Sequence, residues 1–144
     1  MKKKVTFKEY ILFAEAWFFL AISRLMLVFL PFRKIIPLLG RTVVISNNPP
    51  ASTEPPVILS KISLSIRRAG KRSPWRTMCF EQALAAKMML KRRKLVSTIY
   101  FGVCKNASIV GMNMSAHAWI ESYGFILTGE RNRAAFTIVS CFVS

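Results

Sequence analysis

Residues 73–84 read Ser73-Pro74-Trp75-Arg76-Thr77-Met78-Cys79-Phe80-Glu81-Gln82-Ala83-Leu84, and the architecture is most readily inferred outward from this stretch. It predicts the start of a helix, because Thr77 or Ser73 is a suitable N-cap and Pro74 suits an early helical position. Apolar residues recur at helical spacing up to the basic run 91–94, which complements the helix dipole at its C-terminal end. This pattern is typical of a helix that packs within a core.

Strands are predicted after this helix, at about 96–103, 115–122, 125–129 and 135–143. Tyr123-Gly124 separates the second strand from the third and is a signal for a two-residue turn. One helix followed by consecutive strands predicts an α+β fold, in which the helix packs against a mostly antiparallel sheet. The nucleophile-bearing core is expected to span residues 57–144 and to begin with a helix from Val57 to Ala69, closed by Gly70.

The N-terminal part is predicted to be a separate helical region, residues 1–45. Residues 10–30 are strongly apolar but are interrupted by Glu15 and Arg24, and Pro31 ends the run. A membrane span needs ~20 residues with few or no charges, so a buried or partner-facing helix is preferred, then a membrane-surface helix, over a true span. Residues 46–56 contain four prolines and are predicted to form a linker.

The charge is strongly asymmetric, with 22 Lys and Arg against 6 acidic residues and a net charge of +16. Such a charge indicates nucleic acid, an anionic membrane face or an acidic peptide as partner. No DNA- or RNA-binding signature accompanies it, so nucleic acid is not expected. Three cysteines without a disulfide pattern suit the cytoplasm, with attachment to a membrane left open. With one histidine and no aspartate, no metal and no cofactor are expected.

Cys79 and His117 are the candidate catalytic residues. A nucleophilic cysteine needs a lowered pKa and a nearby base. A helix N-terminus supplies the first, and His117, the only histidine, can supply the second. If Tyr123-Gly124 is the loop of a regular hairpin, Glu130 lies directly opposite His117 and can orient the ring. Glu121 is the weaker candidate because it lies four residues along the same strand, which is about 13 Å.

Several motifs, in this order and spacing, resemble those of a known family. The chain resembles the leader peptidase of lasso peptide biosynthesis, the C-terminal-type B protein, within the transglutaminase-like, papain-type cysteine enzymes. The motifs that carry the resemblance are Ala14-Glu15-Ala16, Ala21-Ile22-Ser23-Arg24-Leu25, Leu30-Pro31-Phe32-Arg33, Pro74-Trp75-Arg76-Thr77-Met78-Cys79-Phe80-Glu81-Gln82-Ala83, Tyr100-Phe101-Gly102-Val103, Ala116-His117-Ala118-Trp119 and Leu127-Thr128-Gly129.

This resemblance implies a papain- or transglutaminase-like core with the nucleophile Cys79 and the base His117. It implies that the protein removes the leader from a ribosomally made precursor, with a separate leader-recognition protein and a macrolactam synthetase as partners. Enzymes of the superfamily often use an Asp as third member, and this chain has none. Two alternatives stay open from the sequence: an acyl transferase with the same Cys–His core, and a non-catalytic cationic adaptor that binds an acidic peptide or a membrane.

Overall fold

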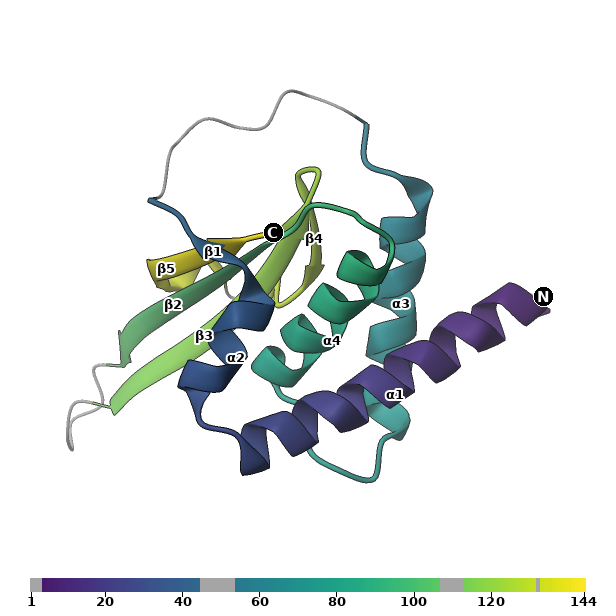
Figure 1. Cartoon of the computed structure of the whole chain (residues 1–144), viewed down its shortest axis with the longest axis horizontal. Helices are drawn as coiled ribbons and strands as arrows, with labels where there is room; N and C mark the ends of the chain where they lie inside the picture. Colours follow the sequence, from purple (N-terminus) through teal and green to yellow (C-terminus); the bar gives the residue numbers. More distant parts are fainter. Residues whose placement is uncertain (1–3, 45–53, 107–112, 132) are drawn as a thin grey trace.

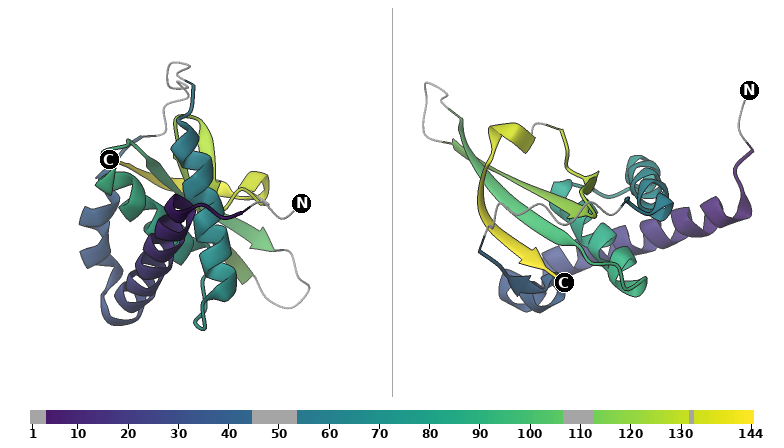
Figure 2. Two further views of the ribbon diagram at one scale, coloured as in Figure 1. Left: turned by 90° about the vertical axis from the view of Figure 1, so that its right-hand side faces the viewer. Right: turned by 90° about the horizontal axis from the view of Figure 1, so that it is seen from above.

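A computed structural model describes residues 4–44, 54–106, 113–131 and 133–144. The helices gather on one side of a single antiparallel sheet, which gives two layers (Figures 1 and 2). In the described part of the chain the elements are α1 (Phe7–Phe29), α2 (Phe32–Leu39), β1 (Arg41–Thr42), α3 (Val57–Arg72), α4 (Cys79–Arg92), β2 (Thr98–Asn106), β3 (Asn113–Ser122), β4 (Phe125–Thr128), the 3₁₀ turn Arg133–Ala135 and β5 (Thr137–Val143). The predicted α+β class, with one helix packed on an antiparallel sheet and helices before it, is confirmed.

The sheet has the strand order β1-β5-β2-β3-β4, so β2 and β3 lie at its centre. Tyr123 and Gly124 both adopt positive φ, 51° and 74°, and join β3 to β4 as the predicted two-residue turn. Next to the turn, Ser122 pairs with Phe125 and Glu121 with Ile126, as in a regular hairpin. The pairing then shifts by one residue, and Ile120 faces Thr128. This bulge changes which residue lies opposite His117, the candidate base.

Helix α4 is the central element of the core. It contacts β3 and β4 on one side and α1 on the other (Figure 1). Its buried residues occupy every side of the helix rather than one stripe, and they are Glu81, Ala83, Leu84, Ala85, Ala86, Lys87, Met89 and Leu90. A helix that is buried all round belongs to the interior of a domain. The helix that carries Cys79 is therefore fixed by the whole fold.

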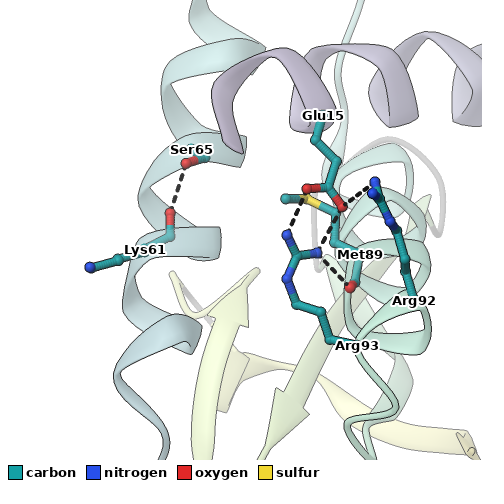
Figure 3. Close-up of polar contacts among 6 residues, drawn as sticks. All are labelled: Glu15, Lys61, Ser65, Met89, Arg92 and Arg93. Carbon is teal, nitrogen blue, oxygen red and sulfur yellow. Dashed lines mark hydrogen bonds and ion pairs between the residues drawn. The ribbon is translucent and has the colours of Figure 1, made fainter. Parts of the chain in front are cut away.

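Helix α1 is held against α4 by ion pairs near both ends of α4. Near its C-terminal end, both guanidinium nitrogens of Arg93 donate to the Glu15 carboxylate at 2.7 Å, and one also donates to the Met89 carbonyl (Figure 3). At its N-terminal end, Arg24 contacts the buried carboxylate of Glu81 at 3.2 Å. The two charges that interrupt the apolar run therefore attach α1 to the core.

Side chains from both halves of the chain form one hydrophobic cluster. Leu12, Ala16 and Leu20 of α1, with Ile35 and Leu39 of α2, belong to the same buried cluster as α3, α4 and the sheet. Most of the expected linker, residues 45–53, lies outside the described residues. In the described part, the N-terminal helices and the sheet share this core.

Two predicted helix boundaries are wrong. Helix α3 continues past Gly70 to Arg72, because Ser73 donates its hydroxyl to the Ala69 carbonyl and ends the last turn there. Helix α4 begins at Cys79, so neither Ser73 nor Thr77 is its N-cap. Met78 takes that position, and its backbone N–H donates to the Glu81 carboxylate at 2.8 Å. An acidic side chain in the first turn thus provides the hydrogen bond at the start of the helix that was expected from a hydroxyl at the N-cap position.

Lys87 is fully buried in α4, which is uncommon for lysine. Its ammonium donates to the carbonyl and the hydroxyl of Ser97, at 2.9 and 3.0 Å. Burial, together with the smaller effect of the neighbouring Lys91 charge, lowers the pKa of Lys87 from 10.5 to about 8. The Ser97 carbonyl also accepts the backbone N–H of Ser144, so it keeps a partner if the ammonium is removed.

Lys87→Met is expected to remove a pH dependence of stability. Because the folded-state pKa of Lys87 lies below its unfolded value, the unfolded chain binds more protons between pH 8 and 10.5. The free energy of unfolding of the wild type should therefore rise with pH across that window relative to the variant, by on the order of 3 kcal/mol. Urea unfolding at several pH values measures this difference, and parallel curves for the two proteins would contradict it.

Candidate active site

Cys79 is the first residue of α4 and is partly exposed. The first N–H groups of a helix have no partner within it and carry the positive end of its dipole. A thiolate at this position is stabilised by both effects, and the backbone N–H groups beside it can donate to a nearby oxyanion. The predicted place of Cys79 at a helix start is confirmed.

His117 lies on β3, directly opposite Gly102 of β2. Its Nε2 is 2.7 Å from the carbonyl oxygen of Gly129. A carbonyl can only accept a hydrogen bond, so Nε2 carries the proton and the lone pair of the neutral ring lies on Nδ1. The rings of Phe136 and Trp119 pack beside the imidazole, with centroids 5.0 and 5.8 Å away. The ring is thus held in place, with Nδ1 as the nitrogen that can accept a proton.

The pairing that led to the prediction of Glu130 as the orienting acid is wrong. The bulge shifts the hairpin by one residue and β4 ends at Thr128, so Glu130 does not pair with His117. The side chain of Glu130 is exposed, and the backbone carbonyl of Gly129 occupies the role expected of a carboxylate. Without that pairing, the catalytic role predicted for Glu130 loses its geometric support, and substitution of Glu130 is what tests it. Glu121 pairs with Thr98 and Ile126, at the far end of the strand from His117.

Cys79, His117 and Glu130 nevertheless line one cleft, with a volume of about 850 Å³. A second, smaller hollow of about 350 Å³ also contains Cys79 and His117. The two candidate residues therefore lie where two cavities meet. No hydrogen bond joins the thiol to the imidazole anywhere in the described residues. In sites without substrate such contacts are often long, and they shorten when substrate binds.

The charge next to Cys79 is balanced by α1. Glu81 lies two residues after Cys79, and an unpaired carboxylate there would disfavour a thiolate. Arg24 pairs with Glu81, whose side chain is only 4% exposed. The same carboxylate accepts the Met78 N–H and so defines where the helix begins. Helix α1 thus contributes to the electrostatics of the site as well as to the core.

Two residues of the site were not predicted from the sequence, Gly129 and Gln82. Gly129 has φ +79°, and a Cβ there would lie 2.5 Å from the Ala118 carbonyl oxygen. Only glycine therefore allows this backbone to approach β3 and present its carbonyl to His117. Gln82 lines the cleft one turn after Cys79 and donates from Nε2 to the Thr77 carbonyl at 3.2 Å. The three-residue spacing from Cys79 could have indicated Gln82, since residues three apart lie on the same face of a helix.

No group of three His, Cys, Asp or Glu side chains in the described ranges is arranged to hold a metal ion. Chemistry at this site would rest on the thiol, the imidazole and the backbone N–H groups at the start of α4.

Comparison with known proteins identifies the family of this chain. The sequence model of the transglutaminase-like superfamily matches residues 26–141. That range contains α2, α3, α4 and the sheet up to Cys141, and hence both Cys79 and His117. The chain therefore belongs to the transglutaminase-like superfamily. No curated protein and no solved structure matches it.

Gly129→Ala is expected to impair turnover, because the added Cβ collides with Ala118 and displaces the carbonyl that orients His117. A drop in kcat of ~10-fold or more is expected, a fraction of what general base catalysis contributes. Gly124→Ala is the matched control: it has a similar positive φ of +74°, but its Cβ meets nothing within 4 Å. Equal losses in the two variants would mean that backbone strain alone, and not the orientation of His117, accounts for the effect.

Glu130→Gln is expected to leave kcat within about threefold of wild type, because a backbone carbonyl already holds Nε2 of His117. Glu121→Gln serves as the comparison at the other end of β3. Steady-state rates and thermal unfolding of both variants check this expectation. A much larger loss for Glu130→Gln with normal folding would restore Glu130 as a catalytic residue.

Proposed function

We propose that this transglutaminase-like protein is a cysteine peptidase that removes the leader from a ribosomally synthesised lasso-peptide precursor. The observation that supports peptidase chemistry most directly is the pair formed by Cys79 at the start of α4 and His117 with its lone pair on Nδ1, both lining one cleft. The sequence motifs in the N-terminal helices, in α4 and in the strands support the leader-peptidase role within the family.

In the first half of the proposed reaction, the Cys79 thiolate attacks the scissile carbonyl carbon and forms a tetrahedral oxyanion. Backbone N–H groups at the start of α4 donate to that oxyanion, and the Gln82 amide is a candidate second donor. The C–N bond then breaks, and protonated His117 gives its Nδ1 proton to the leaving amine, which is the new N-terminus of the core peptide. The leader remains on Cys79 as a thioester.

In the second half, water attacks the thioester carbonyl. His117 accepts the proton of that water on Nδ1, and the C–S bond breaks to release the leader carboxylic acid and the Cys79 thiolate. Throughout, the Gly129 carbonyl keeps the Nε2 proton in place, and so the tautomer and orientation of the ring are conserved between the two steps. An amine that reached the thioester in place of water would turn the same site into an acyl transferase.

The proposed partners are the precursor peptide, a separate leader-recognition protein and a macrolactam synthetase that acts on the freed amine. The positive charge of the chain supports an acidic leader as ligand, since opposite charges accelerate encounter and orient the complex. The exposed residues of α2 offer the recognition protein a surface next to the site, because Phe32 of α2 lines the smaller cavity. The proposed location is the cytoplasm.

Cys79→Ala is expected to abolish precursor cleavage, and neither Cys104→Ala nor Cys141→Ala should do so. Cys141 is buried and donates its thiol to the Val43 carbonyl, so its replacement should cost stability rather than chemistry, about 1–2 kcal/mol. Mass spectrometry of the precursor with each variant and the recognition protein measures cleavage. Cleavage by Cys79→Ala at the wild-type rate would contradict the proposal that the protein is a cysteine peptidase.

A further inference from the structure

The two cavities that meet at Cys79 and His117 have different chemistry. The larger one is lined by three exposed basic side chains, Arg67 and Lys71 of α3 and Arg131 after β4, against a single carboxylate, Glu130. The smaller one is lined mainly by apolar side chains, which are Phe32, Phe80, Phe101, Val103 and Val139. The scissile bond of any bound peptide would lie at their junction.

The apolar side is built from three separate elements. Phe32 of α2, Phe80 of α4 and Phe101 of β2 form a triangle of rings with centroid distances of 6.0, 6.0 and 5.1 Å. Val139 adds an exposed side chain from β5, at the place where the pairing of β2 with β5 shifts. Rings packed in this way present a preformed surface to an apolar side chain at little cost in conformational entropy.

We infer that the cleft selects a peptide with acidic residues on one side of the cleaved bond and a bulky apolar residue on the other. Opposite charge on Arg67, Lys71 and Arg131 would hold the acidic segment, and burial against the phenylalanine triangle would hold the apolar side chain. The inference rests on the proposed function only in taking a peptide as the ligand. It adds the side-chain chemistry that the two halves of the cleft would recognise.

Binding to Cys79→Ala tests this selection without requiring turnover. The probes are fluorescent peptides that carry a Glu-rich segment next to a Leu or Phe, the same peptides with Lys in place of Glu, and the same peptides with Ser in place of the apolar residue. Anisotropy should show at least tenfold weaker binding for each altered peptide. Equal binding of all three would overturn the selection, whereas cleavage by the wild type tests the peptidase function separately.

Variants assign each preference to its half of the cleft. Arg67→Glu should abolish the preference for Glu over Lys, whereas Lys61→Glu, on the same helix but outside the cleft, should retain it. Val139→Asp should abolish the preference for the apolar residue. Val96→Asp is its matched control, because the two valines are 57% and 58% exposed and only Val139 lines the cavity. Loss of a preference in a control as well as in its partner variant would overturn the assignment.

A second inference rests on the outer face of α1, which is apolar along its whole length. Successive turns expose Phe7, Tyr10, Ile11, Trp17, Phe18, Leu25, Val28 and Phe29, and of these Phe7 and Phe29 are 79% and 75% exposed. Among the helices of the described chain, α1 is the one long and apolar enough to cross a membrane. Its inner face, however, carries Glu15 and Arg24 in ion pairs with α4. A span would have to break both pairs, so α1 is suited to lie along a surface.

The charges around the apolar face of α1 indicate the kind of surface on which the helix would lie. Exposed Lys8 lies beside the apolar face, and exposed Arg33 and Lys34 follow it in α2. The two carboxylates of α1 are engaged elsewhere, Glu15 with Arg93 and Glu9 with the Thr6 N–H. We propose that α1 docks the protein in the plane of an anionic bilayer, with its aromatic side chains in the interface and basic residues at the headgroups.

Vesicle flotation of the full chain tests this docking, with phosphatidylcholine vesicles that contain or lack phosphatidylglycerol. Binding should require the anionic lipid and should weaken at high salt. The double variant Phe18→Ser and Leu25→Ser should bind at least tenfold less. Val57→Ser on α3 should bind as the wild type does, although Val57 is more exposed than either residue, at 73% against 57% and 56%. No flotation, equal flotation with both lipids, or self-association through α1 without flotation would overturn the proposal.

Discussion

Burial of α4 on every side is the constraint on which the rest of the structure depends. Alanines at 83, 85 and 86 let the sheet and α1 approach the helix closely, and Leu84, Met89 and Leu90 fill the space between them. A buried helix must satisfy its polar groups within the protein. Glu81 does so at its first turn, and Arg93, just past its last residue, donates to the Met89 carbonyl. These two side chains also form the ion pairs that attach α1, and so one helix fixes the core, the N-terminal helix and the position of the nucleophile.

The imidazole of His117, the candidate base, is held by a backbone carbonyl rather than by a carboxylate. The bulge in the β3–β4 hairpin and the positive φ of Gly129 bring a carbonyl to within 2.7 Å of His117 Nε2. A carbonyl has no net charge, so it stabilises an imidazolium less than a carboxylate would, but it fixes the tautomer equally well. This arrangement explains how a chain without Asp can present an oriented base. Removal of that single carbonyl contact should therefore matter more than neutralising any nearby acid.

The sequence was sufficient for the elements and for the two candidate catalytic residues. Helical spacing located α4 and strand patterns located β2 to β5, because these signals are local and strong. The bulge could not be predicted from local patterns. It lies at Leu127, which is buried and whose carbonyl accepts the hydroxyl of Ser63, a residue of α3 far away in the sequence. Because the predicted register lacked this bulge, it placed Glu130 opposite His117, where the Gly129 carbonyl lies in the structure. The N-cap of α4 was assigned to the wrong residue, because the Glu81 side chain accepts the Met78 N–H from inside the helix. The burial of Lys87 was missed because its partner Ser97 lies on a loop.

The central claim is that Cys79 and His117 act together, and the rate of Cys79 alkylation at neutral pH tests it most directly. Iodoacetamide reacts with the thiolate, so the labelling rate at Cys79, measured by peptide mass spectrometry, reports the reactivity of that sulfur. Cys79 of His117→Ala should label more slowly than Cys79 of the wild type, because no imidazole remains to accept the thiol proton. Equal labelling rates in the two proteins, both correctly folded, would contradict the account.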